Sequence, residues 1–300
     1  MEKTKAKWKG RTGGGQFGQW FLLTTLAHID VRFFYPILYL VIPFYLLFGW
    51  KNARVTFEYF HIRQQYSWMR SLGMTFRNYI CFGKVVLDKF AVAAGRPQQF
   101  EIEVEGEDYM MSLLNNEKGF ILASAHVGNF ELAGHCLSQN RKQVFGIVYG
   151  GENNKYMQKR MESFKETHVT LISVEEDMSH LFAIKDALDG GNIVSLQCDR
   201  IFGNSAKHIV TLPFLNGDAQ FPLGVFRIAS QLEVGVLSVF ALKVSNRRYK
   251  VIAEPLMWDD SCKNSIQQSK NLCHQYVDKL EKIIKKYPIQ WFNYYKFWEK

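Results

Sequence analysis

The strongest constraint on the fold is a regular alternation of short apolar runs and amphipathic stretches from residue 100 onwards. The apolar runs, which predict strands, are residues 100–105, 119–125, 143–149, 169–174, 192–198, 209–213, 232–243 and 249–255. The stretches with helical spacing are residues 110–116, 130–139, 154–167, 179–188, 222–231 and 266–287. Strands that alternate with helices predict an α/β fold, in which helices flank a mainly parallel central sheet. In such sheets, sites form at the carboxyl ends of the strands.

A histidine lies at the end of one predicted strand. The run at residues 120–125 ends in His126, a Gly-Asn pair follows, and Glu131 comes five residues after the histidine. On one helix these two side chains would point roughly 140° apart, so they meet only if the chain turns between them. Gly128 and Asn129 permit that turn. The pattern therefore predicts a general base, His126, oriented by the carboxylate of Glu131.

Two other interpretations of this segment stay open. Glu131 alone can serve as a helix N-terminal carboxylate that complements the helix dipole. His135 lies four residues after Glu131, so these two and His126 are also a candidate metal set, which no further pattern supports. We therefore predict no metal.

A second predicted strand ends in charged residues. Residues 192–198 are followed by Asp199 and Arg200. If this strand is the neighbour of the strand before His126, then His126 and Asp199 line one cleft. The alternative is that Asp199 and Arg200 only cap and stabilise the local structure.

The chain before residue 100 divides into three parts. Residues 1–18 form a basic, Gly-rich arm, and residues 19–51 are strongly apolar. No charge occurs from residue 33 to residue 50, a length at the short limit for a membrane-spanning helix. Pro36 and Pro43 should kink it. We expect a membrane anchor, either one helix or a kinked segment that dips in and returns. The alternative is a buried helical hairpin. Residues 52–300 are the expected catalytic domain, which begins with helical residues 52–96.

Composition narrows the functional class. The net charge is +9, aromatic residues make up 15% of the chain, and the five cysteines are scattered. A basic, aromatic-rich surface suits an anionic membrane or an acidic partner protein. No zinc-finger spacing, basic zipper or aromatic RNA-binding box is present, so we expect no nucleic-acid partner. The cysteines predict reduced thiols.

Four blocks of sequence, in order, carry a family resemblance. The segment Ser-Ala-His-Val-Gly-Asn-Phe-Glu at residues 124–131 is similar to the HxxxxD/E block of the lysophospholipid acyltransferase superfamily, in the form typical of bacterial lipid A late acyltransferases. Residues 197–200 resemble the aspartate block of that family, residues 210–215 its Pro-Phe block, and residues 287–292 its ending. The resemblance covers essentially the whole chain. Two mild departures are Phe130, where Trp is common, and Ile289, where an acidic residue is common.

The resemblance implies acyl transfer by direct attack, without a nucleophilic Ser or Cys. His126 would be the general base and Glu131 its orienting carboxylate. Backbone amides around residues 127–129 would hold the oxyanion. Arg200, oriented by Asp199, would hold a phosphate such as that of pantetheine. The implied substrate-binding residues are Asn129, Asp199, Arg200, Pro213 and Phe214.

The same resemblance implies the setting of the reaction. The acyl donor would be acyl carrier protein or acyl-CoA, used as co-substrate without any other cofactor. The acceptor would be a membrane lipid such as a lipid A precursor, at the bacterial inner membrane, with the catalytic domain facing the cytoplasm. Two alternatives are an acceptor of the aryl polyene, flexirubin or aminolipid type, and a non-catalytic lipid-binding member of the fold.

Overall fold

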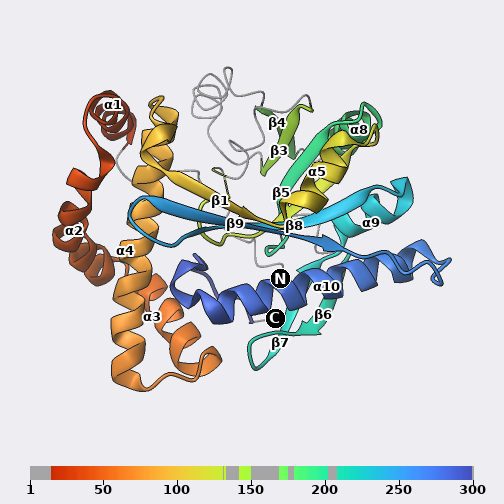
Figure 1. Ribbon diagram of the computed structural model, residues 1–300. Coiled ribbons are helices and arrows are strands. Elements are labelled where there is room, and N and C mark those ends of the chain that lie inside the picture. Colours follow the sequence, from red (N-terminus) through yellow and green to blue (C-terminus); the bar gives the residue numbers. More distant parts are fainter. Residues whose placement is uncertain are drawn as a thin grey trace.

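The computed structural model describes residues 15–130, 132, 142–149, 169–174, 179–201 and 208–298. A seven-stranded sheet lies at its centre, with the strand order β1-β9-β8-β2-β5-β3-β4 (Figure 1). Its strands are β1 (Glu101–Glu105), β2 (Phe120–Ser124), β3 (Val144–Tyr149), β4 (Val169–Val174), β5 (Ile193–Gln197), β8 (Gly235–Lys243) and β9 (Arg248–Leu256). All neighbouring strands pair in parallel except β8 and β9. The predicted α/β fold with a mainly parallel sheet is confirmed.

A second, two-stranded sheet stands apart from the first. It is an antiparallel hairpin of β6 (Ile209–Pro213) and β7 (Asp218–Pro222). Leu215 and Asn216, with φ of 47° and 58°, form the turn between them. The sequence predicted β6 but not β7, because β7 has neither a long apolar run nor a clear alternation.

Side-chain alternation along the strands creates two cores, one on each face of the sheet. Ile121 and Ala123 of β2 point into a core that also receives residues of α8 (Ser179–Asp189), α9 (Gly224–Leu232) and α10 (Ser265–Lys286). Phe120 and Leu122 point to the other face, where α5 (Glu107–Asn115) packs. The stripe of α10 that faces the sheet is fully buried, as its helical spacing predicted. It comprises Leu272, Tyr276, Leu280 and Ile284.

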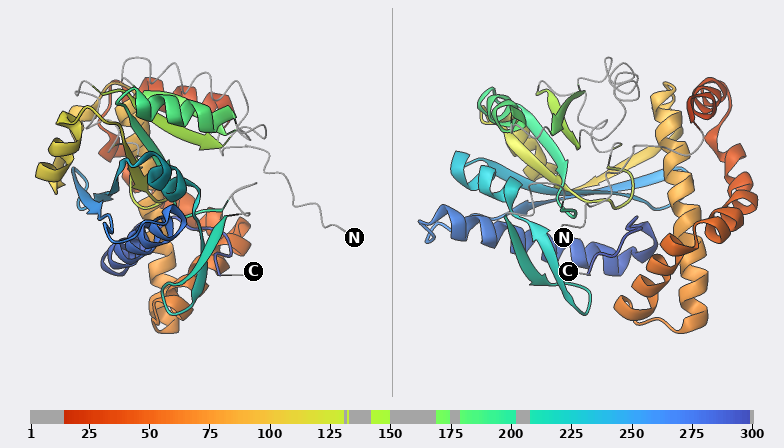
Figure 2. Two further views of the ribbon diagram at one scale, coloured as in Figure 1. Left: turned by 90° about the vertical axis from the view of Figure 1, so that its right-hand side faces the viewer. Right: turned by 180° about the vertical axis from the view of Figure 1, so that it is seen from behind.

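Four N-terminal helices stand together on one side of the sheet (Figures 1 and 2). They are α1 (Gly15–Leu26), α2 (Tyr35–Phe48), α3 (Trp50–Glu58) and α4 (Trp68–Ala93). A single π turn, Tyr59–Arg63, interrupts the helical region that was predicted for residues 52–96. The apolar tract 19–51 is also divided, because its residues belong to α1, α2 and the start of α3.

Helix α2 packs against α4 with one side only. Tyr35 and Ile42 are buried, whereas Leu40 is 72% and Phe48 86% exposed. Residues 31–48 are long and apolar enough to cross a membrane, and only 17% of this stretch is buried. A mostly exposed apolar surface differs from the buried helical hairpin that was the alternative for this region, because a helix in a soluble core hides its apolar side chains.

Candidate functional site

The carboxyl ends of β2 and β5 bring the predicted base next to Asp199. The two strands pair in parallel, with Ser124 opposite Gln197, so the residues that follow them are neighbours. His126 Nδ1 lies 2.7 Å from Asp199 Oδ1, and the backbone N–H of His126 donates to Asp199 Oδ2 over 3.1 Å. The expectation that these two residues share one site is therefore confirmed as a matter of geometry.

Asp199 is an ionised carboxylate within the protein interior. Its side chain is 1% exposed, and Trp291 Nε1–H also donates to Oδ2, over 3.2 Å. Burial alone would raise the pKa of Asp199, but the charge and hydrogen bond of His126, the nearby Arg200 and the bond from Trp291 lower that pKa to about 2. An ionised carboxylate only accepts hydrogen bonds, so the proton of the neutral imidazole lies on Nδ1. His126 Nε2 is then free of a proton and able to act as a base.

The turn after His126 depends on Gly128. This residue has a φ of +59°, and a Cβ there would come within 2.0 Å of the carbonyl oxygen of Ala241. The Gly128 N–H donates to Gln290 O over 2.9 Å, and the Asn129 N–H donates to Ala241 O over 2.7 Å. Both amides were expected to hold the oxyanion. That expectation is wrong for these two groups, because their hydrogens are already bonded to backbone carbonyls.

The segment 288–292 closes the site from the other side. Trp291 pairs with Val127 in an antiparallel bridge, and the Phe292 N–H donates to His126 O over 2.9 Å. The Gln290 side chain bonds both the N–H and the carbonyl of Lys243, at 2.8 Å each. No function was predicted for these residues, although the resemblance of residues 287–292 to the ending of a known family was a signal for them.

Arg200 also contacts this closing segment. Its Nη2–H donates to Phe292 O over 2.9 Å, and its guanidinium lies 5.3 Å from the ring centre of Tyr295. No hydrogen bond joins Asp199 to Arg200 within the described residues, and Arg200 lowers the pKa of this carboxylate through its charge. The orientation of Arg200 by Asp199 stays a prediction.

The remaining predicted residues occupy three kinds of position. Phe214 is buried and packs against Trp291, with ring centres 5.7 Å apart, so it supports the indole that binds Asp199. Pro213 is exposed at the end of β6, and Asn129 is buried in the turn. Glu131 lies outside the described residues, so its contact with His126 stays a prediction.

The metal alternative is equally untested. It needs Glu131 and His135, which both lie outside the described residues. Among the residues that are described, no group of three or more His, Cys, Asp or Glu side chains is arranged to bind a metal ion.

A buried ion pair lies behind the site. Lys243 Nζ is 2.5 Å from Asp88 Oδ2, and the two side chains are 5% and 0% exposed. Tyr35 OH donates to Asp88 Oδ1 over 2.5 Å, and Tyr249 OH also donates to this carboxylate. The cluster ties α2 and α4 to the strands β8 and β9, and Lys243 is the residue whose backbone Gln290 holds.

The sequence matches a known protein family over most of its length. The sequence profile described as bacterial lipid A biosynthesis acyltransferase matches residues 71–300, well over half of the chain. The chain belongs to this family. The bacterial lipid A biosynthesis acyltransferases are enzymes that transfer acyl groups in lipid synthesis, so this protein is an acyltransferase. A search of curated proteins finds no match.

The family match includes the residues that build the site. His126, Asp199, Arg200 and Trp291 all fall within residues 71–300. The candidate site is thus formed by two strand ends of the parallel sheet and by a closing segment from far along the chain. The apolar surface of α2 lies before the matched region, and the apolar stretch of residues 31–48 agrees with a membrane-associated family.

Proposed function

We propose that this acyltransferase moves a fatty acyl group from acyl carrier protein or acyl-CoA to a hydroxyl of a membrane lipid such as a lipid A precursor. The observation that carries the proposal is the contact of 2.7 Å between His126 Nδ1 and the buried Asp199. It leaves Nε2 of an imidazole that is 23% exposed as the base for an incoming hydroxyl.

In the proposed reaction, the same imidazole accepts the proton of the attacking hydroxyl and returns it to the leaving group. His126 Nε2 takes the proton of the acceptor hydroxyl while the hydroxyl oxygen attacks the thioester carbon. Asp199 stabilises the imidazolium that results, as the carboxylate of a catalytic triad does. When the tetrahedral intermediate collapses, the C–S bond breaks and the imidazolium returns the proton to the leaving thiolate. Glu131 is the predicted second carboxylate of the site.

Direct attack fits the residues around the histidine. Cys198 precedes Asp199, but it is 1% exposed, and burial raises the pKa of its thiol well above the ordinary value. A thiol that stays protonated is a poor nucleophile. Its thiol donates a weak hydrogen bond to the carbonyl oxygen of Leu196, at 3.8 Å. A covalent acyl-cysteine intermediate is therefore not part of the proposal.

The proposed setting is the bacterial inner membrane, with the site facing the cytoplasm. The exposed apolar side of α2, which includes Leu40, Phe44 and Phe48, supports insertion into one leaflet. Residues 31–48 are long enough to cross a bilayer, but Tyr35 and Ile42 of α2 are buried against the rest of the protein, which leaves one side of the helix for lipid. We propose that residues 20–50 dip into the membrane and return. The net charge of +9 supports an acidic carrier protein as donor.

Lipid mass spectrometry of the host tests the proposal. The comparison needs the wild type, a deletion strain, and strains with His126→Ala or, as the matched control, His274→Ala. His274 is an exposed histidine of α10, and its side chain is 58% exposed. Loss of one acyl chain from lipid A in the deletion and His126→Ala strains only is the expected result, since a general base contributes about 10²–10⁴-fold to the rate.

Two other outcomes would change the conclusion. Intact lipid A with loss of another acylated lipid, such as a pigment lipid or an aminolipid, would keep the mechanism and replace the acceptor. An unchanged acylation pattern in every strain, together with no transfer by the purified enzyme, would contradict the proposed function and favour a lipid-binding protein.

A further inference from the structure

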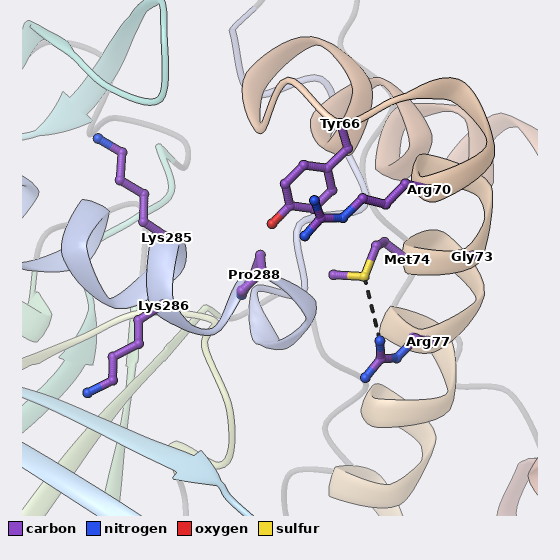
Figure 3. Close-up of a pocket in the computed structure, with 8 residues that line it drawn as sticks. All are labelled: Tyr66, Arg70, Gly73, Met74, Arg77, Lys285, Lys286 and Pro288. Carbon is purple, nitrogen blue, oxygen red and sulfur yellow. Dashed lines mark hydrogen bonds between the residues drawn. The ribbon is translucent and has the colours of Figure 1, made fainter.

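A basic pocket lies between α4 and the end of α10, outside the acyl-transfer site. It has a volume of about 480 Å³. Arg70, Met74 and Arg77 extend from α4 toward Pro288, and Lys285 and Lys286 stand on the opposite wall (Figure 3). The lining residues are Tyr66, Arg70, Gly73, Met74, Arg77, Lys285, Lys286 and Pro288. Four of these eight residues are cations and none is acidic, so the pocket attracts anions.

The two arginines are not neutralised by the surrounding protein. Arg70 stacks on the ring of Tyr66, 3.8 Å from its centre, and Arg77 Nη1 contacts Met74 Sδ at 3.9 Å. Within the part of the chain that the structure describes, neither guanidinium forms a salt bridge with a carboxylate. Lys285 is bound to Glu281, and its ammonium group is directed away from the arginines in Figure 3. Arg70 and Arg77 are thus the groups that are ready to bind a ligand.

Both arginines belong to one wall of the pocket. They are seven residues apart on α4, so they project from the same side of the helix two turns apart. Gly73 lies between them, and a Cβ at this position would meet nothing within 4 Å, so the floor of the pocket is open. Guanidinium groups bind phosphate oxygens through two parallel hydrogen bonds.

The pocket adjoins the catalytic segment. Pro288 lines it, and Asn78, the residue after Arg77, donates to the carbonyls of Ile289 and Trp291 over 3.0 and 3.1 Å. Trp291 is the residue that bonds Asp199. Three residues of chain span at most about 11 Å, so an anion in the pocket lies one short segment away from the acyl-transfer site.

The same stretch of α4 carries exposed apolar residues. Trp68 is 57% and Met69 72% exposed, directly before Arg70. Apolar side chains beside arginines are typical of a surface that meets lipid, with the cations at the level of the headgroups. A concave pocket of a few hundred Å³ also fits a small group better than a carrier protein, which would need about 800 Å² of surface.

We propose that this pocket binds a phosphate of the headgroup of the acceptor lipid and so holds the acceptor in register with His126. This inference rests on the proposed function, because it assumes a membrane lipid as acceptor. It assigns the pocket between α4 and the end of α10 as the phosphate site, with Arg70 and Arg77 as the groups that recognise the phosphate.

The test pairs variants of the full chain with two forms of one acceptor. The acceptors are an acylated glucosamine disaccharide with phosphates and the same lipid after phosphatase treatment. The variants are Arg70→Gln and Arg77→Gln, with Arg77→Lys as the conservative exchange and Lys282→Gln as the control. Lys282 is an exposed cation of α10 that does not line the pocket.

The expected result is a KM for the phosphorylated acceptor that rises about tenfold or more in each arginine variant, because a charge-assisted hydrogen bond is lost. The KM for the acyl donor and kcat should stay within about twofold of wild type. Arg77→Lys should recover part of the loss, and Lys282→Gln should show none. With the dephosphorylated acceptor, wild type and variants should have the same KM.

Three results would overturn the proposal. The first is an equal rise of KM for the phosphorylated and the dephosphorylated acceptor. The second is a rise in the KM for acyl carrier protein while the KM for the acceptor is unchanged. The third is unchanged kinetics in both arginine variants. Calorimetric binding of the two lipids and of inorganic phosphate, measured in His126→Ala so that no turnover occurs, separates this proposal from the proposed function. If arginine variants bind the phosphorylated lipid as wild type does, the pocket assignment fails even where acyl transfer occurs. If inorganic phosphate binds as tightly as the lipid, the headgroup assignment fails.

Discussion

Replacing Asp199 by asparagine tests how the catalytic histidine keeps its proton on the correct nitrogen. The carboxylate accepts three hydrogen bonds: from His126 Nδ1 at 2.7 Å, from the His126 backbone N–H at 3.1 Å and from Trp291 Nε1 at 3.2 Å. An amide has one oxygen and one NH₂ group, so in Asp199→Asn it cannot accept from both sides. Either its NH₂ group faces His126 Nδ1, or it faces the other two donors.

The hydrogen bonds around residue 199 determine which of the two amide orientations is more stable. If the NH₂ group faces the backbone N–H of His126 and the indole N–H of Trp291, two buried donors lose their acceptor, at about 1–3 kcal/mol each. If it faces Nδ1, the imidazole changes tautomer and nothing is left unpaired. The second arrangement is therefore favoured by about 2–6 kcal/mol, and it puts a proton on Nε2, where the base must be free. That difference corresponds to a loss of about 30- to 10⁴-fold in kcat, and the same exchange in a catalytic triad costs about 10⁴-fold.

The assay is acyl transfer by purified Asp199→Asn in detergent, beside the urea midpoint of unfolding. We expect kcat to fall by at least about 30-fold, whereas the urea midpoint falls only by the equivalent of about 2 kcal/mol, the contribution of the ionised carboxylate. Trp291→Phe provides the control, because it removes one of the two donors and keeps an aromatic ring against Phe214. In the Trp291→Phe background, the fall in kcat caused by Asp199→Asn should be at least about fivefold smaller. A variant that retains more than a tenth of wild-type kcat, or an equal cost in both backgrounds, would refute the reasoning.

Three further predictions concern stability and membrane binding. Because the pKa of Asp199 is lowered from 3.8 to about 2, its ionised form stabilises the fold by about 2 kcal/mol above pH 4. This contribution is lost as the pH falls toward 2, so the urea midpoints of wild type and Asp199→Asn should converge in acid; a constant difference would contradict the assignment. Asp88→Asn should destabilise the protein by about 3–5 kcal/mol, since it leaves Lys243 buried without its partner, and Lys243→Met in the same chain should recover part of the loss in urea unfolding. If the losses of stability caused by Asp88→Asn and Lys243→Met add up in the double variant, Asp88 and Lys243 do not form an ion pair. Leu40→Asp with Phe44→Asp should reduce sedimentation with membranes at an unchanged melting temperature, and undiminished sedimentation would show that α2 is not the contact.

Most of the sheet could be predicted from the sequence, because buried parallel strands are near-continuous apolar runs and their ends fall where those runs stop. The placement of His126 and Asp199 at adjacent strand ends follows from that pattern once the two strands are neighbours. The short strand β7 carries no such run, and only its pairing with β6 shows that it is a strand.

The partners of the catalytic carboxylate could not be predicted in the same way. Trp291 reaches Asp199 from 92 positions further along the chain, and no local periodicity encodes such a contact. The sequence pairs Asp199 with Arg200 because the two are adjacent, whereas successive residues point in different directions after a strand, and the hydrogen bonds of Asp199 go to His126 and Trp291. For helix α2, hydropathy predicts an apolar surface but does not show that Tyr35 and Ile42 on one side of the helix are buried.

The late position of residues 288–292 in the chain has a consequence for how the enzyme is made. His126 leaves the ribosome long before Gln290 and Trp291, which hold the turn at Gly128 and bind Asp199. The helices α1 and α2 emerge earlier still. During synthesis the site therefore stays incomplete until residues 288–292 have left the ribosome, and until then a nascent chain holds His126 and Asp199 without the segment that fixes them.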